Sequence, residues 1–85
     1  MVKFKIGLNA SQDLWMAGFV NDETQVAAFE DAYCAAAAQY AHEHDLQIDV
    51  VCGSGAQLQG CDTSEDAAAI WQAIHDRVSW DGPRH

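Results

Sequence analysis

The longest stretch with a single hydrophobic period lies between Asp22 and His44. Its apolar residues recur every three or four positions, as on one stripe of an α-helix: Val26, Phe29, Tyr33, Ala36, Ala37 and Tyr40. Asp22 followed by Gln25 matches a capping box, and Glu23 places negative charge near the positive end of the helix dipole. No Gly or Pro interrupts the stretch. The pattern therefore predicts a helix over residues 22–44.

Four shorter stretches are interpreted as strands from their alternating or continuous apolar residues and the turn formers between them. They span residues 3–8, 14–20, 46–51 and 57–61. The second of these is apolar on both faces, which indicates a strand covered on both sides, and Gly18 within it suggests a bulge. Residues 9–13 and 53–56 are rich in turn formers, so we expect a hairpin loop at each.

A second amphipathic helix is expected after Thr63 or Ser64, either of which can cap its first turn. Its apolar stripe contains Ala67, Ile70, Trp71, Ile74 and Val78. The chain then forms two consecutive ββα units within one small acidic α+β domain, residues 1–85. We expect these units to build a four-stranded, mainly antiparallel sheet with two helices packed on one face.

This arrangement predicts both a core and an exposed face. The core should contain Phe29, Tyr33, Ile70, Trp71 and Ile74, which come from both helices. The sheet face away from the helices should carry Trp15, Phe19 and Val51. An exposed aromatic patch on so short a chain is typical of a surface that a partner covers.

The charge balance changes the picture of function. The 85 residues contain 13 Asp and Glu but only four Lys and Arg, so the formal net charge is −9. Such a surface repels nucleic acid and anionic membranes and attracts basic partners. Solubility is the alternative explanation of this charge. There is also no apolar segment long enough to span a membrane, so we expect a cytoplasmic protein.

The sequence contains no clear motif for metal binding, phosphate binding or catalysis. The three cysteines and four histidines lack the spacing of a zinc knuckle, and Gly53-Ser54-Gly55 lacks the Lys of a phosphate loop. Adjacent acidic pairs such as Glu30 and Asp31 diverge on a helix and do not converge as an acid and a base. We therefore expect no catalytic residue, no metal and no cofactor. A small metal-binding or enzymatic domain is the third choice.

Two surfaces remain as partner-binding candidates. The first is the outer face of the helix over residues 22–44, with Glu23, Glu30, Asp31 and Glu43. Carboxylates one turn apart on a helix are separated by about 5–6 Å, near the phosphate spacing of nucleic acid. The second is the aromatic pair Trp15 and Phe19. The Ala35–Ala38 run adds a smooth helix surface that permits close approach of a backbone.

Two resemblances point in the same direction. Residues 60–70, with the sequence GCDTSEDAAAI, resemble the strand-to-helix segment of HicB-type antitoxins. In size, acidity and α/β make-up, the chain resembles phage-encoded anti-CRISPR and anti-restriction inhibitors. Both resemblances imply a protein that neutralises another protein.

The leading hypothesis is a non-catalytic acidic inhibitor that blocks a basic, nucleic-acid-binding partner as a nucleic-acid mimic, in the manner of a phage-type anti-CRISPR or anti-restriction protein. It would bind a protein, with no direct contact to nucleic acid or membrane. The alternative is a HicB-like antitoxin, or another neutralising or homodimeric module, that works through the aromatic sheet face.

Overall fold

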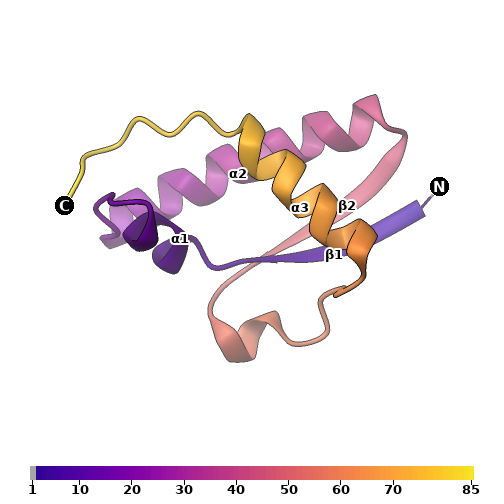
Figure 1. The fold of residues 1–85 in the computed structure, drawn as a ribbon, viewed down its shortest axis with the longest axis horizontal. Coiled ribbons are helices and arrows are strands. Elements are labelled where there is room, and N and C mark those ends of the chain that lie inside the picture. Colours follow the sequence, from indigo (N-terminus) through magenta and orange to yellow (C-terminus); the bar gives the residue numbers. More distant parts are fainter. Residues whose placement is uncertain (1) are drawn as a thin grey trace.

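The computed structural model describes residues 2–85, which form a two-stranded sheet and three α-helices (Figure 1). In chain order the elements are β1 (Val2–Leu8), α1 (Ala10–Met16), α2 (Glu23–Glu43), β2 (Leu46–Cys52), the 3-10 turn η1 (Gly55–Leu58) and α3 (Glu65–Arg77). The C-terminal segment after α3 runs back to α1, so the C-terminus lies beside α1 (Figure 1).

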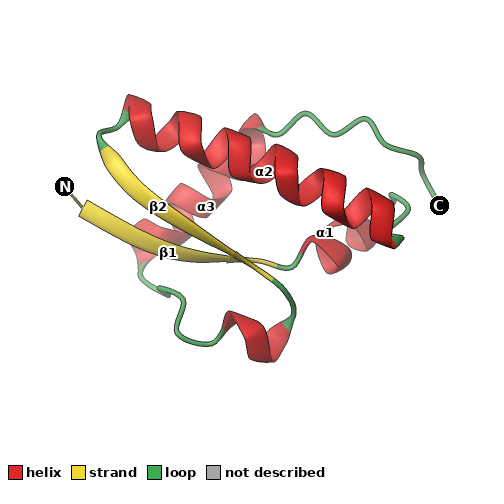
Figure 2. Ribbon diagram, turned by 180° about the vertical axis from the view of Figure 1, so that it is seen from behind, coloured by secondary structure: helices red, strands yellow, loops and turns green. Residues whose placement is uncertain are grey.

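The two strands are parallel, and their register runs from Val2 opposite Leu46 to Leu8 opposite Cys52. Parallel neighbours need a long crossover connection, because the chain must return to the end where the first strand began. Here α1 and α2 provide that connection (Figure 2). A two-stranded sheet is marginal in water, so packing against the helices must stabilise it.

The core lies between one face of the sheet and the two longer helices. α2 packs on β2, α3 packs on β1, and the two helices contact each other. The most deeply buried large side chains are Leu8, Leu14, Tyr33 and Ile74. Phe29 and Ile70 are also buried, and Trp71 packs against them while half-buried, so the predicted core residues do meet. The Tyr33 hydroxyl donates to the Trp71 carbonyl oxygen at 3.2 Å.

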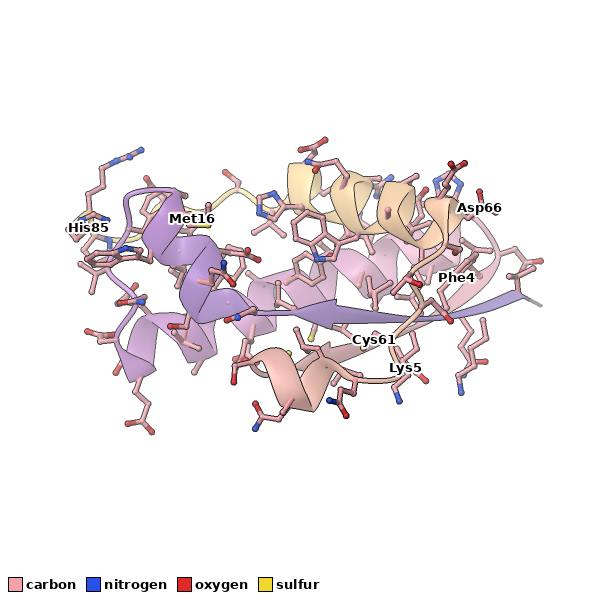
Figure 3. The ribbon with its side chains drawn as sticks, turned by 60° about the horizontal axis from the view of Figure 1, so that its bottom comes forward. Phe4, Lys5, Met16, Cys61, Asp66 and His85 are labelled. Atoms are coloured by element: carbon pink, nitrogen blue, oxygen red, sulfur yellow. The ribbon has the colours of Figure 1, made fainter. Side chains whose placement is uncertain are left out.

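The other face of the sheet is covered by a loop instead of a helix. Figure 3 shows α3 on one side of β1 and η1 on the other. A Cβ atom at Gly7 would lie 3.1 Å from a Leu58 methyl carbon and 3.4 Å from the Cys61 sulfur, so glycine lets this loop approach β1 closely. At the exposed end of the same face, Lys3 pairs with Asp49 at 3.1 Å.

The helix predicted over residues 22–44 is confirmed as α2. Its N-cap Asp22 accepts a hydrogen bond from the Gln25 amide at 2.9 Å. The second helix is confirmed as α3, where the Ser64 hydroxyl oxygen accepts from the Ala67 amide at 3.1 Å. The predicted strands over residues 3–8 and 46–51 correspond to β1 and β2.

The strand predicted over residues 14–20 is wrong, because this region is the end of helix α1. Asn9 caps its start and accepts from the Gln12 amide at 3.2 Å. Gly18 ends the helix with a positive φ of 89°. Its amide donates to the Trp15 carbonyl oxygen at 3.1 Å, and the Phe19 amide donates to the Leu14 carbonyl oxygen at 2.8 Å. These two bonds form a Schellman motif, so Gly18 is a helix stop and not a bulge.

The strand predicted over residues 57–61 is also wrong. Leu58 ends the turn η1, and Gly60 has a φ of 85°, which interrupts an extended conformation. The sheet therefore has two parallel strands within the described residues, not four mainly antiparallel ones, and the two ββα units do not exist. The predicted aromatic sheet face disappears with them, because Trp15 lies on α1 and Phe19 follows it.

Candidate binding surfaces

Charge is strongly segregated along this chain. All the Lys and Arg residues lie near its ends, so residues 6–76 contain none, although they carry nearly all the carboxylates. Two of the terminal cations are used in ion pairs, Lys3 with Asp49 and Arg77 with Glu43. The segment that forms α2 and β2 is therefore acidic, and a basic partner would be attracted to it over a long range.

Glu23 and Asp31 fit the sequence prediction best. Both are exposed on α2, and neither has an ion-pair partner within residues 2–85. Glu23 also lies in the first turn of the helix, where a negative charge is stabilised by the helix dipole. Eight residues separate them, so at about 100° per residue their side chains leave the helix about 80° apart. They can face one partner together.

Glu30 lies on α2 but is less exposed than Glu23 and Asp31. It is half-buried, and its carboxylate stands beside the thiols of Cys34 and Cys52, where α2 meets the end of β2. Burial of the thiol, together with the neighbouring Cys34 and Glu30, raises the pKa of Cys52 to about 12. This thiol therefore stays protonated at neutral pH and is a poor nucleophile. Glu30 therefore neighbours this cluster, although it leaves α2 within about 20° of Glu23.

Glu43 forms an ion pair with Arg77. Both of its carboxylate oxygens accept from the Arg77 guanidinium, with Nη2 to Oε1 at 3.1 Å. These hydrogen bonds lower the pKa of Glu43 and raise that of Arg77. Glu43 also lies twenty residues after Glu23, so it projects from roughly the opposite side of α2, about 200° away. It ties α2 to α3 and is not part of one stripe with Glu23.

Trp15 and Phe19 lie near each other at the end where the C-terminal segment meets α1. Trp15 is 57% exposed and stacks on the His85 ring, with centroids 4.2 Å apart. Phe19 is half-buried, and Arg84 lies over its ring at 4.6 Å from the centroid. Met16, which is 76% exposed, lies at the same end of the molecule as His85 (Figure 3). The chain thus covers Phe19 itself but leaves Trp15 and Met16 open.

The sequence does not predict one further feature, the open edge of β2. Lys5 exchanges hydrogen bonds with Asp62 on the outer side of β1, at 2.7 and 2.8 Å. The backbone N–H and C=O groups of the odd-numbered residues of β1 therefore face away from β2, and those of the even-numbered residues bond to β2. By the same alternation, the backbone groups of Ile48 and Val50 face away from β1. A groove of about 330 Å³ lies there, between β2 and the small residues Ala37 and Ala38 of α2.

Within residues 2–85, no three His, Cys, Asp or Glu side chains stand close enough together to hold a metal ion. No helix in that range is both long and apolar enough to cross a bilayer. Comparisons with protein-family models, with curated proteins and with solved structures find no match to this chain.

Proposed function

We propose that this chain is a non-catalytic acidic inhibitor that binds a basic, nucleic-acid-binding surface of another protein. The observation that carries the proposal is the absence of Lys and Arg from residues 6–76, combined with the free, exposed carboxylates of Glu23 and Asp31 on α2. Solubility alone requires net charge, but it does not require exposed carboxylates without an ion-pair partner on one helix.

The inhibition follows from competition for the same charges. A protein that holds nucleic acid does so largely through Lys and Arg contacts to phosphates. A rigid helix with exposed carboxylates can occupy those contacts, and long-range attraction speeds the encounter of the two proteins. We place this activity in the cytoplasm, where nucleic-acid-binding proteins and reduced cysteines are both found.

The experiment is capture of the partner followed by competition. The immobilised chain is incubated with lysate of its host, and the captured proteins are identified by mass spectrometry. The proposal expects a basic protein whose nucleic acid is displaced when the free chain is added. Capture should fail with the double variant Glu23→Lys/Asp31→Lys. It should persist with Asp66→Lys/Asp81→Lys, which changes the net charge equally on elements other than α2. A captured protein that keeps its nucleic acid would contradict the proposal.

One observation favours a second candidate, a neutralising module that binds through apolar contacts. Trp15 and Met16 are adjacent in sequence and both largely exposed, which is uncommon for large apolar side chains on a small protein. Because aromatic anchors usually control dissociation, Trp15→Ala should raise the dissociation rate if this surface binds the partner. If that variant abolishes capture while the Glu23 and Asp31 reversal binds normally, the apolar candidate replaces the charged one.

A further inference from the structure

A cavity of about 200 Å³ lies where α1, α2, the end of α3 and the C-terminal segment meet. Three aromatic rings line it, those of Phe19, Phe29 and Trp80, and each comes from a different part of the chain. The lining also contains two polar side chains, those of Asp13 and His75. The cavity is smaller than the 300–1,000 Å³ of usual ligand pockets. It therefore suits a single small chemical group.

Asp13 is the acidic member of this lining. Its Oδ2 atom is shielded from solvent and has no hydrogen-bond partner within residues 2–85, and the indole N–H of Trp80 is likewise buried without a partner there. A buried carboxylate oxygen without a partner is costly, because the charge loses its hydration and gains nothing in exchange. Burial accordingly raises the pKa of Asp13, and the nearby His75 offsets this only in part. A cation placed in the cavity would lie beside the Asp13 side chain and would be attracted to its negative charge.

The aromatic rings favour the same kind of ligand. The faces of aromatic rings carry partial negative charge, so they attract cations within about 6 Å of the ring centroid. The chain already uses this attraction, because Arg84 lies over the Phe19 ring. Phe29 and Trp80 meet edge to face with centroids 5.4 Å apart, so the planes of the two rings are nearly perpendicular. Several aromatic rings and one carboxylate in a single lining are the groups that bind organic cations.

We infer that this cavity binds the ammonium group of an organic cation, which the Phe19, Phe29 and Trp80 rings surround and the Asp13 carboxylate neutralises. The group can belong to a free small molecule with a quaternary ammonium or to the lysine side chain of a bound protein. The site is separate from the exposed carboxylates of α2, so the inference does not rest on the proposed function.

Two cations of the chain itself are close and set limits on the affinity. The Arg84 guanidinium already occupies one face of the Phe19 ring, and His75 carries a positive charge when it is protonated. Both would oppose a second cation at short range. We therefore expect binding in the millimolar range for the isolated group, and tighter binding for Arg84→Ala.

The test is a titration followed by NMR of the Trp80 indole N–H, which is assigned by its loss in Trp80→Phe. Three ligands are compared at matched ionic strength: choline, n-butylammonium as a mimic of a lysine side chain, and 3,3-dimethylbutan-1-ol as the uncharged isostere of choline. The inference predicts saturable shifts with the ammonium ligands and none with the alcohol. Stronger binding of choline identifies a quaternary ligand, and stronger binding of n-butylammonium identifies a lysine side chain.

Variants separate this site from nonspecific binding. Asp13→Asn keeps the shape of the side chain but removes its charge, so ammonium affinity should fall about tenfold or more. Asp76→Asn is the matched control, since it removes an exposed carboxylate next to His75 in sequence and should leave the affinity unchanged. Circular dichroism confirms that both variants fold. Equal shifts with the uncharged alcohol, no saturable shift with either ammonium ligand, or unchanged affinity in Asp13→Asn would each overturn the inference.

Discussion

Carboxylates occur in two very different surroundings in this protein. Asp13 lines a small aromatic cavity, whereas Glu23 and Asp31 stand in water on α2. At 4 Å, two unit charges interact by about 1 kcal/mol in bulk water but by about 4 kcal/mol at the effective dielectric constant of about 20 that describes partly buried sites in proteins. The same chemical group therefore supports short-range recognition of one cation in the cavity. On α2 it supports long-range, salt-sensitive attraction of a basic surface.

The largest expected effect concerns the packing that the cavity shares with the core. Phe29 is 5% exposed and belongs to both, so Phe29→Ala should lower the free energy of unfolding by about 3–5 kcal/mol. Denaturant unfolding measures this directly. Met16→Ala is the control, because Met16 is largely exposed and its loss should cost no more than about 0.5 kcal/mol. Similar values for the two variants would show that Phe29 is not in the core.

A smaller effect tests the end of α1, which positions one wall of the cavity. Gly18 has a positive φ, so Gly18→Ala should destabilise the fold by about 1–2 kcal/mol. Gly55→Ala is the matched control, because a Cβ atom there meets nothing within 4 Å and the φ is not positive. Its stability should be unchanged or slightly higher. If Gly18→Ala is as stable as the wild type, the Schellman motif is absent.

The pH dependence of stability should show a still smaller effect at Asp13. Its pKa is raised in the folded state from the ordinary 3.8, so the folded chain binds this proton more tightly than the unfolded chain. The stability that protonation contributes is present at low pH and is lost as the pH rises through the folded pKa. Asp13→Asn should therefore be more stable than the wild type at neutral pH.

This difference should shrink as the pH falls below 3.8, where Asp13 is protonated in both states. Urea unfolding of the two proteins across this pH range provides the measurement. A wild type that is more stable than Asp13→Asn at neutral pH would mean that Asp13 already has a partner.

The helices that sequence analysis places correctly are those with clear periods and caps. Asp22 and Ser64 each precede a long apolar stripe, so local and tertiary signals agree at α2 and α3. α1 is only seven residues long, so its period is too short to distinguish from strand alternation. Its signals were at the ends instead, because Asn9 and Gly18 bracket a helix as cap and stop. Because residues 14–20 are apolar, they also fit a strand, and that interpretation predicts a sheet that the structure does not have.

The acidic surface of α2 was predictable from the sequence in part, and the cavity around Asp13 was not. Net charge and its exposure follow from composition, and Glu23 and Asp31 are exposed on α2 as expected. The partners of Glu43 and Glu30 were not predictable, since Arg77 and Cys52 approach them only through the packing of α3 and β2 on α2. The cavity around Asp13 depends on the C-terminal segment folding back over α1, which no local pattern indicates.

We propose that exposed charge on α2 drives association with a basic partner. The most direct test measures the association rate with the captured protein by surface plasmon resonance from about 0.1 to 1 M salt, over which the Debye length falls from about 10 to 3 Å. The wild type should associate quickly at low salt and slow steeply as salt rises. Glu23→Lys/Asp31→Lys should associate slowly throughout, with a weak dependence on salt. Equal rates and equal salt dependence for the two proteins would contradict the claim.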